Sequence, residues 1–212
     1  MPEASVVLWV GGEVLHEEVF ASDRNHNAMI FTALEKVLER LGQVSLDLVI
    51  VGTGPGSYSG TRIGISAGQG VAIAHGCPAV GLGSFAATAV ARESESAMAV
   101  GDARRGVYFV SRIGDCGEAM GVELIKREEF LNVLEGAVGK TLFTFDTVDS
   151  LELGEDLPGN IVQVRPEARY LLDVWHGLSE ERRQELQVLP LSPTYLRAPF
   201  TSKAKSGHPL LR

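Results

Sequence analysis

The sequence predicts an α/β fold, because patterns typical of buried strands alternate with helical patterns along most of the chain. LDLVIV (46–51) and PAVGL (78–82) are short apolar runs that suit strands buried on both faces of a sheet. A segment with a helical pattern, from about Ser57 to His75, separates them. The chain has 212 residues, of which 45% are hydrophobic, so it can bury a core in one large domain or two small lobes.

The N-terminal part predicts a hairpin followed by an amphipathic helix. ASVVLWV and EVLHEEVF flank Gly11-Gly12, a pair that readily supplies the positive φ of a tight turn. From Asn27 to Leu41, apolar residues recur at helical spacing opposite a charged face. We expect Ser22 or Asp23 to cap this helix and Gly42 to end it. The next helix is expected to end at Gly76, before Pro78.

The remaining chain predicts further strands and helices. SFAATAVARE has the pattern of a short helix, and AMAVGDARRGVYFVSRI that of a second hairpin. VELI, KTLFTFD and NIVQV then alternate as strands with the helix patterns REEFLNVLEG and PEARYLLDVWHG. From Leu189 the chain is rich in Pro, Ser and basic residues, and we expect a loosely attached end. We predict an N-terminal lobe at 1–95, a C-terminal α/β lobe at 96–198 and a basic tail at 199–212.

Composition limits the classes of function. The net charge of −8 and the pI near 5.2 exclude a uniformly basic surface, so contact with RNA would need a local patch or a basic partner. Cys77 and Cys116 form neither a CxxC pair nor a disulfide framework, which favours reduced thiols in a cytoplasmic protein. The N-terminus lacks the pattern of a signal peptide. The uncharged stretch from Ile63 to Ala91 is interrupted by Gly and Pro, so we expect burial within protein and no membrane span.

The stretch VGTGPGSYSGTRIG, from Val51 to Gly64, could cradle a phosphate or form a plain turn. Glycines between a strand and a helix let backbone N–H groups point at an anion, so Gly54, Gly56 and Ser57 are weak candidates for cofactor binding. The stretch lacks the Lys-Ser/Thr of a Walker A loop and the spacing of GxGxxG. Pro55 also removes one donor N–H. Both interpretations stay open.

Small residues form a stripe along the helix that follows. At 100° per residue they fall on one face that ends at His75: Gly60, Gly64, Ala67, Gly68 and Val71. Each glycine inside a helix costs about 1 kcal/mol relative to alanine, and close approach of another backbone would compensate. That backbone could belong to the chain's own sheet or first helix, or to another molecule.

Side-chain catalysis finds little support in the sequence. The histidines form no HxxxH or HExxH pair, so we expect no metal site: His16, His26, His75, His176 and His208. No GxSxG motif marks a serine nucleophile. Asp102, in GDARRG, could serve a magnesium or phosphate site beside Arg104 and Arg105, or it could cap a hairpin turn with both arginines in solvent.

Three blocks resemble the TsaB (YeaZ) family, the bacterial partners of TsaD in making threonylcarbamoyladenosine in tRNA. They are VGTGPGSYSGTRIGISAGQGVAIAHGCPAVGLGSFAATA, DARRGVYF and the late PTYLRAP. RNHNAMIF also looks like a variant of the family's entry to the first helix. The resemblance runs from about Ala4 to Pro199, and the GPGSYSGTRIG block together with DARRG is specific.

The resemblance implies an actin-like, ribonuclease-H-like fold with two lobes and a non-catalytic subunit. TsaB-like proteins form homodimers, or heterodimers with TsaD through their first two helices, and TsaD carries the metal and the chemistry. Carried onto this chain, the resemblance gives these interface residues: Met29, Ile30, Ala33, Val37, Gly60, Gly64, Ala67, Gly68 and Val71. It implies a TsaE-like ATPase in the complex, contact with tRNA only through the partner, and ATP or ADP only near the TsaD interface. The alternative is an ATP-hydrolysing enzyme or glycoprotease-like peptidase of the actin-like superfamily.

One departure from the family pattern concerns the beginning of the sequence. Family members begin with a central strand that ends in an IDTS-like turn, just before the segment equivalent to ASVVL, and this chain starts at MPEASVVLW. We therefore expect the family's first strand to be missing from the sheet. We also expect Met1 to be an internal methionine of a longer protein.

Overall fold

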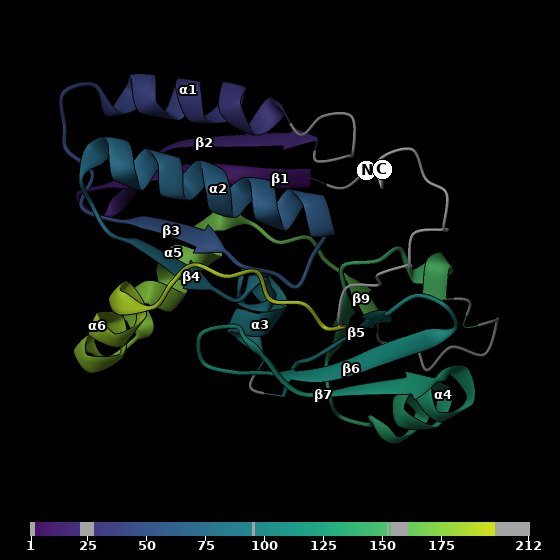
Figure 1. Cartoon of the computed structure of the whole chain (residues 1–212). Helices are drawn as coiled ribbons and strands as arrows, with labels where there is room; N and C mark the ends of the chain where they lie inside the picture. Colours follow the sequence, from purple (N-terminus) through teal and green to yellow (C-terminus); the bar gives the residue numbers. More distant parts are fainter. Residues whose placement is uncertain (1–2, 22–27, 95, 152, 154–160, 198–212) are drawn as a thin grey trace, which may run out of the picture.

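The computed structural model describes residues 3–21, 28–94, 96–151, 153 and 161–197, which form two regions with separate sheets (Figure 1). The elements of the first region are β1 (Glu3–Val10), β2 (Glu13–Ala21), α1 (Met29–Leu41), β3 (Val49–Gly52), α2 (Tyr58–His75) and β4 (Ala79–Leu82). β1 and β2 form the expected antiparallel hairpin, and β3 and β4 form a parallel pair. α1 packs on the hairpin, and α2 packs on β3.

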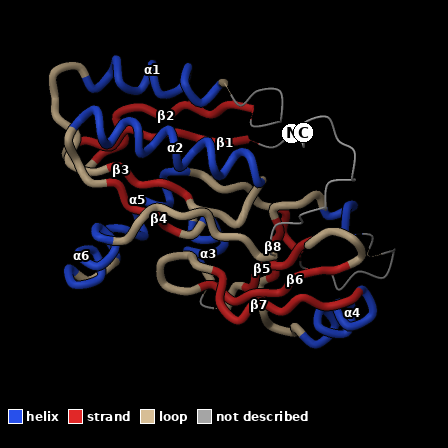
Figure 2. The backbone as a smooth tube through the Cα atoms, viewed as in Figure 1, coloured by secondary structure: helices blue, strands red, loops and turns tan. Residues whose placement is uncertain are grey.

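The first region has no continuous sheet. In the described ranges, neither β1 nor β3 pairs with a strand other than β2 and β4, respectively. The two pairs nevertheless lie in one layer, with α1 and α2 on one face (Figures 1 and 2). The helix α5 contacts both β1 and β3 from the other side. The helices therefore join the two strand pairs, and described residues form no ladder between β1 and β3.

The second region is built on one five-stranded sheet with the order β7-β6-β5-β8-β9. Its elements are β5 (Met98–Asp102), β6 (Val107–Ile113), β7 (Ala119–Lys126), α4 (Arg127–Gly136), β8 (Leu142–Thr144) and β9 (Ile161–Gln163). β5 lies between antiparallel β6 and parallel β8, so its backbone is paired on both edges. Phe130 of α4 and Phe143 of β8 are both fully buried. This sheet matches the strand patterns expected from the sequence.

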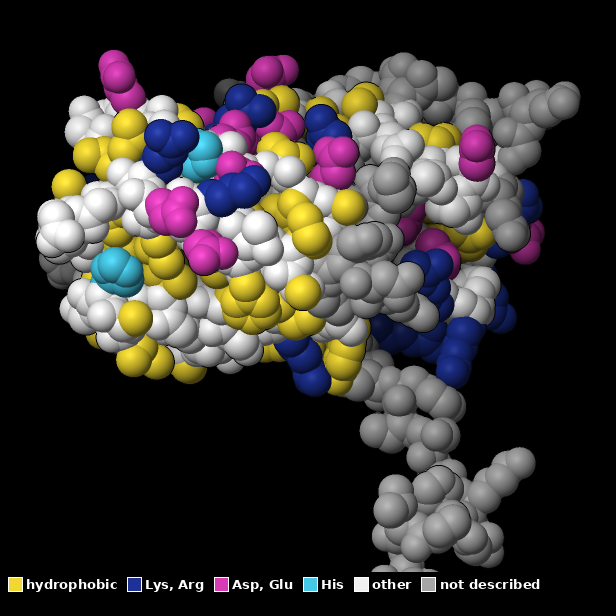
Figure 3. All heavy atoms as spheres, turned by 90° about the horizontal axis from the view of Figure 1, so that it is seen from above, with side chains coloured by type: hydrophobic (Ala, Val, Ile, Leu, Met, Phe, Trp, Pro, Cys, Tyr) yellow, Lys and Arg dark blue, Asp and Glu magenta, His cyan; other side chains and the backbone are white. Residues whose placement is uncertain are grey.

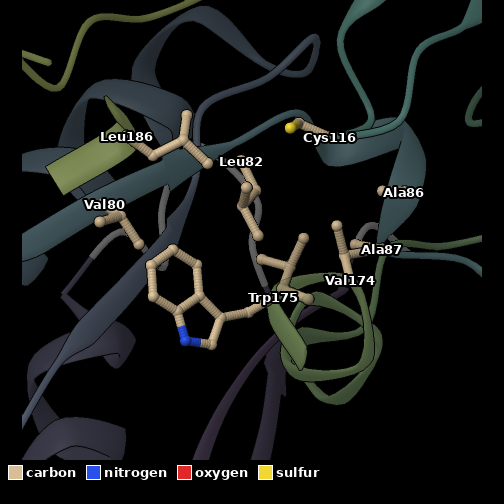
Figure 4. Packing of buried hydrophobic residues seen from close by; sticks show 9 residues of the cluster. Val80, Leu82, Ala86, Ala87, Cys116, Val174, Trp175 and Leu186 are labelled. Atoms are coloured by element: carbon tan, nitrogen blue, oxygen red, sulfur yellow. The ribbon is translucent and has the colours of Figure 1, made fainter. Parts of the chain in front are cut away.

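After the five-stranded sheet the chain returns to the first region. The helices α5 (Ala168–Gly177) and α6 (Glu180–Val188) pack against β3 and β4. Trp175 of α5 and Leu186 of α6 share a buried cluster with Val80 and Leu82 of β4 (Figure 4). Residues far apart in the sequence therefore complete the core beneath β3 and β4.

Two sequence-based expectations are wrong. SFAATAVARE forms two pieces, a short 3-10 helix (Ser84–Ala86) and α3 (Ala89–Glu93). Buried Thr88 separates them, because its hydroxyl donates to the carbonyl of Phe85 and accepts from the N–H of Ala91. The segment 189–197 is attached to the molecule, because the N–H of Thr194 donates to the carbonyl of Thr53 at 2.8 Å and Leu196 packs on the second region. Residues 198–212 lie outside the described part.

The N-terminus of α2 and the C-termini of α1 and α2 follow common capping rules. Ser57 caps α2, because its hydroxyl accepts a hydrogen bond from the N–H of Gly60 at 3.0 Å. Gly42 and Gly76 end α1 and α2 with positive φ values of 62° and 66°. α1 begins at Met29, and the expected caps Ser22 and Asp23 lie outside the described residues. Within the described ranges, every helix is too short or too polar to cross a bilayer.

Candidate functional site

Backbone groups of the loop between β3 and α2 form hydrogen bonds within the chain. The N–H of Gly54 donates to Ser84 Oγ at 2.9 Å, and its carbonyl accepts from the N–H of Ser84 at 2.8 Å. Gly54 has φ 96°, and the Gly54–Pro55 peptide bond is cis. A side chain at Gly54 would also meet the carbonyl oxygen of Thr194 at 2.8 Å. The glycines of this loop therefore serve close approach of two other segments, and phosphate binding at Gly54, Gly56 and Ser57 stays a prediction.

Asp102 holds the turn that connects β5 and β6. Its Oδ1 accepts from the backbone N–H of Arg104 at 2.6 Å, and its Oδ2 pairs with the Arg104 guanidinium at 3.0 Å. The backbone N–H of Asp102 donates to Asp146 Oδ2 at 2.9 Å. These contacts match the hairpin-capping alternative. Over the described ranges, no three His, Cys, Asp or Glu side chains gather in a way that could hold a metal ion.

The segment 191–197 lies between this turn and the loop after β3. Tyr195 stacks on Tyr58 with 5.3 Å between ring centroids, and its hydroxyl accepts from Arg62 Nε at 2.6 Å. Arg197 donates to the carbonyl oxygens of Ala103 and Arg104 at 3.3 and 3.1 Å. The structure thus connects the loop after β3 with the turn at Asp102 through a segment that was expected to be loosely attached. PTYLRAP, quoted for its resemblance to the family, is the signal that marks this segment.

The stripe of small residues on α2 divides into two groups. Ala67 and Gly68 are buried, and a side chain at Gly68 would lie 2.4 Å from Val51 Cγ2 of β3. For these two residues the close backbone belongs to the chain's own sheet. Gly60, Gly64 and Val71 are half-buried, and a Cβ at Gly64 would meet no described atom within 4 Å. Space for another molecule therefore exists at Gly64 and not at Gly68.

The candidate interface residues of α1 also form a buried group and a more exposed group. Ala33 and Val37 are 3% and 4% exposed, and Val37 packs with Leu8 of the hairpin. Their burial means that they hold α1 in place and offer almost no surface to a partner. Met29 is exposed and Ile30 is half-buried. The interface role of Met29, Ile30, Gly60, Gly64 and Val71 stays a prediction.

The structure also exposes apolar side chains that the sequence analysis did not select. Phe31 of α1 is 60% exposed and Ile73 of α2 is 81% exposed. In the view from above (Figure 3), hydrophobic side chains lie partly among uncharged surface and partly next to a group of charged side chains. Helical periodicity could have indicated Ile73, since it lies opposite the buried face of α2.

Charged side chains on the hairpin and α1 form an exposed polar cluster. Glu18 of β2 lies 2.9 Å from Lys36 Nζ of α1 and 2.8 Å from His16 Nε2. Hydrogen bonds, first from Lys36 and then from His16, hold the pKa of the Glu18 carboxyl below its ordinary value. Elsewhere, burial raises the pKa of the Cys77 thiol, which disfavours the reactive thiolate. The polar cluster attaches α1 to the hairpin and resembles no catalytic arrangement.

The chain is similar to proteins of one tRNA modification system. The family model described as "TsaD: tRNA N6-adenosine threonylcarbamoyltransferase" matches residues 13–148. The tRNA threonylcarbamoyladenosine biosynthesis protein TsaB of Haemophilus influenzae is 26% identical over 221 residues, with 96% of this chain and 92% of that protein covered. The Escherichia coli protein of the same name is 34% identical over 84 residues, which cover 38% of this chain and 36% of that protein.

Solved structures show the same fold. YeaZ from Pseudomonas aeruginosa has a TM-score of 0.63 and 21% identity, with 91% of this chain and 94% of that chain covered. A protein described as uncharacterized, with similarity to peptidase YEAZ from Pseudomonas aeruginosa, has a TM-score of 0.65 and 23% identity, with 92% of this chain and 94% of that chain covered. The fold is therefore the actin-like, ribonuclease-H-like fold that the resemblance predicts.

Proposed function

Because the chain belongs to the family that comprises TsaD and its TsaB (YeaZ) relatives, we propose that it is the non-catalytic, activating subunit of a threonylcarbamoyl transfer complex. A role in the biosynthesis of threonylcarbamoyladenosine in tRNA follows from its relatives. The partner in the proposal is a TsaD-like subunit, which supplies the metal and the reacting groups. A homodimer in the absence of the partner and a TsaE-like ATPase in the complete complex belong to the same proposal.

The outward surface of α2 is the observation that carries the proposal. From Ile63 to His75 the helix contains no Asp, Glu, Lys or Arg. Its outward side chains are nevertheless exposed in this chain, and they include Ser66, Gln69, Gly70 and Ile73. A solvated helix face normally carries charges, whereas the centre of a protein interface is depleted of them. This uncharged face therefore suits burial against a partner.

Two glycines leave the backbone of α2 open to close packing. Gly70 lies on this outward face, and half-buried Gly64 lies at the edge of the buried face. Added side chains at Gly64 and Gly70 would meet no described atom within 4 Å. The backbone of α2 is thus accessible there, so a partner helix can approach closely and gain dispersion contacts. Phe31 of α1 is a further exposed apolar side chain. A TsaD-like subunit with an apolar two-helix face is the occupant that the family membership suggests.

The arrangement of the described polar residues favours a supporting role. The loop after β3 is closed by Ser84 and Thr194, and Asp102 caps its own turn. At both places the polar groups form hydrogen bonds within the chain, which suits a structural role better than acid–base catalysis. In the proposal, ATP or ADP binds at or near the interface with the TsaD-like subunit.

Size-exclusion chromatography with a TsaD-like subunit tests the proposal. We expect a stable complex at micromolar concentrations, and Ile73→Lys and Gly64→Lys should each weaken it at least about tenfold, because a charge would have to be desolvated in an apolar contact. Val138→Lys is the matched control, since Val138 is 88% exposed on the second region. Gly68 is unsuitable for this test because it packs on Val51.

Two results would contradict the proposal. The first is no complex at micromolar concentrations, with or without ATP. The second is a complex that Ile73→Lys and Gly64→Lys weaken no more than Val138→Lys does, while circular dichroism shows all three variants folded. Nucleotide hydrolysis by the isolated chain, lost in Asp102→Ala, would favour the ATPase alternative.

A further inference from the structure

Arginine and tyrosine side chains gather where the segment 191–197 crosses the molecule. Arg62 lies over the ring of Tyr58, with its guanidinium carbon 4.1 Å from the ring centroid, and donates to the hydroxyl of Tyr195. Two residues further along, Arg197 contacts the carbonyl of Arg104. This arginine–tyrosine surface comprises Tyr58, Arg62, Arg104, Arg105, Tyr195 and Arg197. Figure 3 shows Lys and Arg side chains gathered on this side of the second region.

The charge of this surface is opposite to that of the whole chain. The net charge of the chain is −8. The surface has four arginines. Two carboxylates lie at its turn: Asp102, which pairs with Arg104, and Asp146, which accepts from the backbone N–H of Asp102. Positive charge is thus concentrated at one place on an acidic protein, and such a local patch attracts polyanions.

The turn between β5 and β6 holds its arginines in an unfavourable backbone conformation. Arg104 and Arg105 have φ values of 72° and 61°, and they are the two described non-glycine residues with positive φ. Arginine adopts this left-handed conformation at a cost that glycine and asparagine largely avoid. A turn selected only for stability would place Asn or Gly there. Strained residues of this kind cluster at functional sites, so the strain points to a role for the guanidinium groups.

Tyr58 offers a ring face beside these charges. Its side chain remains half exposed. The Arg62 guanidinium is 5.7 Å from the Tyr195 ring, and a guanidinium on the face of Tyr58 opposite Tyr195 would lie much farther away. Arg62 and Tyr195 therefore lie on the same side of the Tyr58 ring. Because its neighbours occupy one side of the ring, the other side can stack on an unpaired base. The arginines nearby can bind the phosphates.

We propose that the arginine–tyrosine surface binds single-stranded RNA directly, with the arginines on phosphates and Tyr58 stacked on a base. The proposal rests on the proposed function, because the tRNA of that reaction supplies the RNA. This proposal replaces the expectation that the chain contacts tRNA only through its partner. That expectation considers the net charge of the whole chain and not the charge of a local surface. Tyr58 and Arg62 precede the uncharged part of α2, so the RNA surface and the proposed partner surface occupy successive parts of the helix.

Fluorescence anisotropy tests the proposal. It uses the full chain and a labelled RNA hairpin that has a single-stranded loop. The double variant Arg104→Asn/Arg105→Gly should weaken binding at least about fivefold and reduce the slope of log K against log salt by about 1 to 2. The same variant should leave the urea midpoint of unfolding unchanged or higher, because Asn and Gly accept positive φ. A loss of binding without a loss of stability would separate a binding role from a structural one.

A matched control removes the same charge elsewhere. Arg92→Gln/Lys140→Gln removes two exposed positive charges outside the surface and should change RNA affinity less than about twofold. Tyr58→Leu should weaken binding of the hairpin loop and leave binding of fully paired RNA unchanged, since paired bases cannot stack on the ring. Heparin binding, which needs only charge, should be insensitive to Tyr58→Leu.

Three results would overturn the proposal. They are no RNA binding by the chain at low salt, equal losses in the surface and control double variants, or equal loss of hairpin and duplex binding in Tyr58→Leu. The proposed function fails separately. A chain that forms the TsaD complex but binds no RNA contradicts only this inference, and a chain that binds RNA but forms no complex contradicts only the proposed function.

Discussion

The two regions of the molecule join their strands in different ways. In the second region one sheet of five strands joins its elements, and β5 has paired neighbours on both edges. In the first region two separate pairs of strands are joined by the helices that cover them. Val100 of β5 is fully buried, whereas Val6 and Val7 of β1 remain half-buried. A strand with an unpaired edge keeps part of its side-chain surface accessible even when helices cover both faces.

The difference teaches that stability in the first region depends on distant segments. Its core beneath β4 needs α5 and α6, which both follow the second region in sequence. The second region buries Phe130 and Leu151 with residues of its own. We therefore expect the two regions to respond differently to comparable substitutions.

The largest difference is expected between core truncations. Val100→Ala should lower the free energy of unfolding by about 2 to 3 kcal/mol, because Val100 is 0% exposed and a cavity would remain. Val6→Ala in β1 should cost only about 1 kcal/mol, since part of that side chain already contacts water. Urea denaturation of both variants measures the difference, and equal losses would contradict it.

The two glycines of α2 should give effects of opposite sign. Gly68→Ala should destabilise by about 1 to 3 kcal/mol, because the new methyl group would lie 2.4 Å from Val51 Cγ2. Gly64→Ala should stabilise by about 0.5 to 1 kcal/mol, because the methyl group meets open space and alanine favours a helix. Thermal unfolding compares the two. A stable Gly68→Ala variant would show that α2 does not rest on β3 as described.

The segment 189–197 can be tested through its contact with the second region. Leu196→Ala should lower the free energy of unfolding by about 1 to 2 kcal/mol, because Leu196 packs against the cluster of Phe85 and Phe143. Leu189→Ala should change it by less than about 0.5 kcal/mol, since Leu189 is 53% exposed. Limited proteolysis should cut the Leu196→Ala variant faster after Arg197. Identical unfolding of the two variants would mean that the segment contributes nothing to the fold.

The smallest effect concerns the link between α1 and the hairpin. The pKa of Glu18 is lowered in the folded chain, so its interaction with Lys36 and His16 stabilises the fold above the unfolded pKa of about 4.3. This contribution is lost as the pH falls through the lower, folded pKa. Lys36→Met should raise the pKa of Glu18, as followed by NMR titration, and Lys140→Met is the control. An unchanged Glu18 pKa would contradict the ion pair.

Local features of the sequence determined much of this protein. Gly11-Gly12 predicts the first turn, Ser57 caps α2, and Gly42 and Gly76 end their helices, because capping and positive φ depend on a few neighbouring residues. The strand and helix patterns from residue 46 to 177 are confirmed except in SFAATAVARE, where one hydroxyl at Thr88 splits the helix.

Only the tertiary structure decided which of the small residues on α2 contact the rest of the chain. The sequence places Gly64 and Gly68 on one stripe, but β3 fills the space at Gly68 and nothing described fills it at Gly64. Likewise, composition alone favours a loose end at Leu189, whereas Thr53 and Tyr58 bind Thr194 and Tyr195 there. These contacts join residues more than 130 positions apart, and local periodicity carries no information about such pairs.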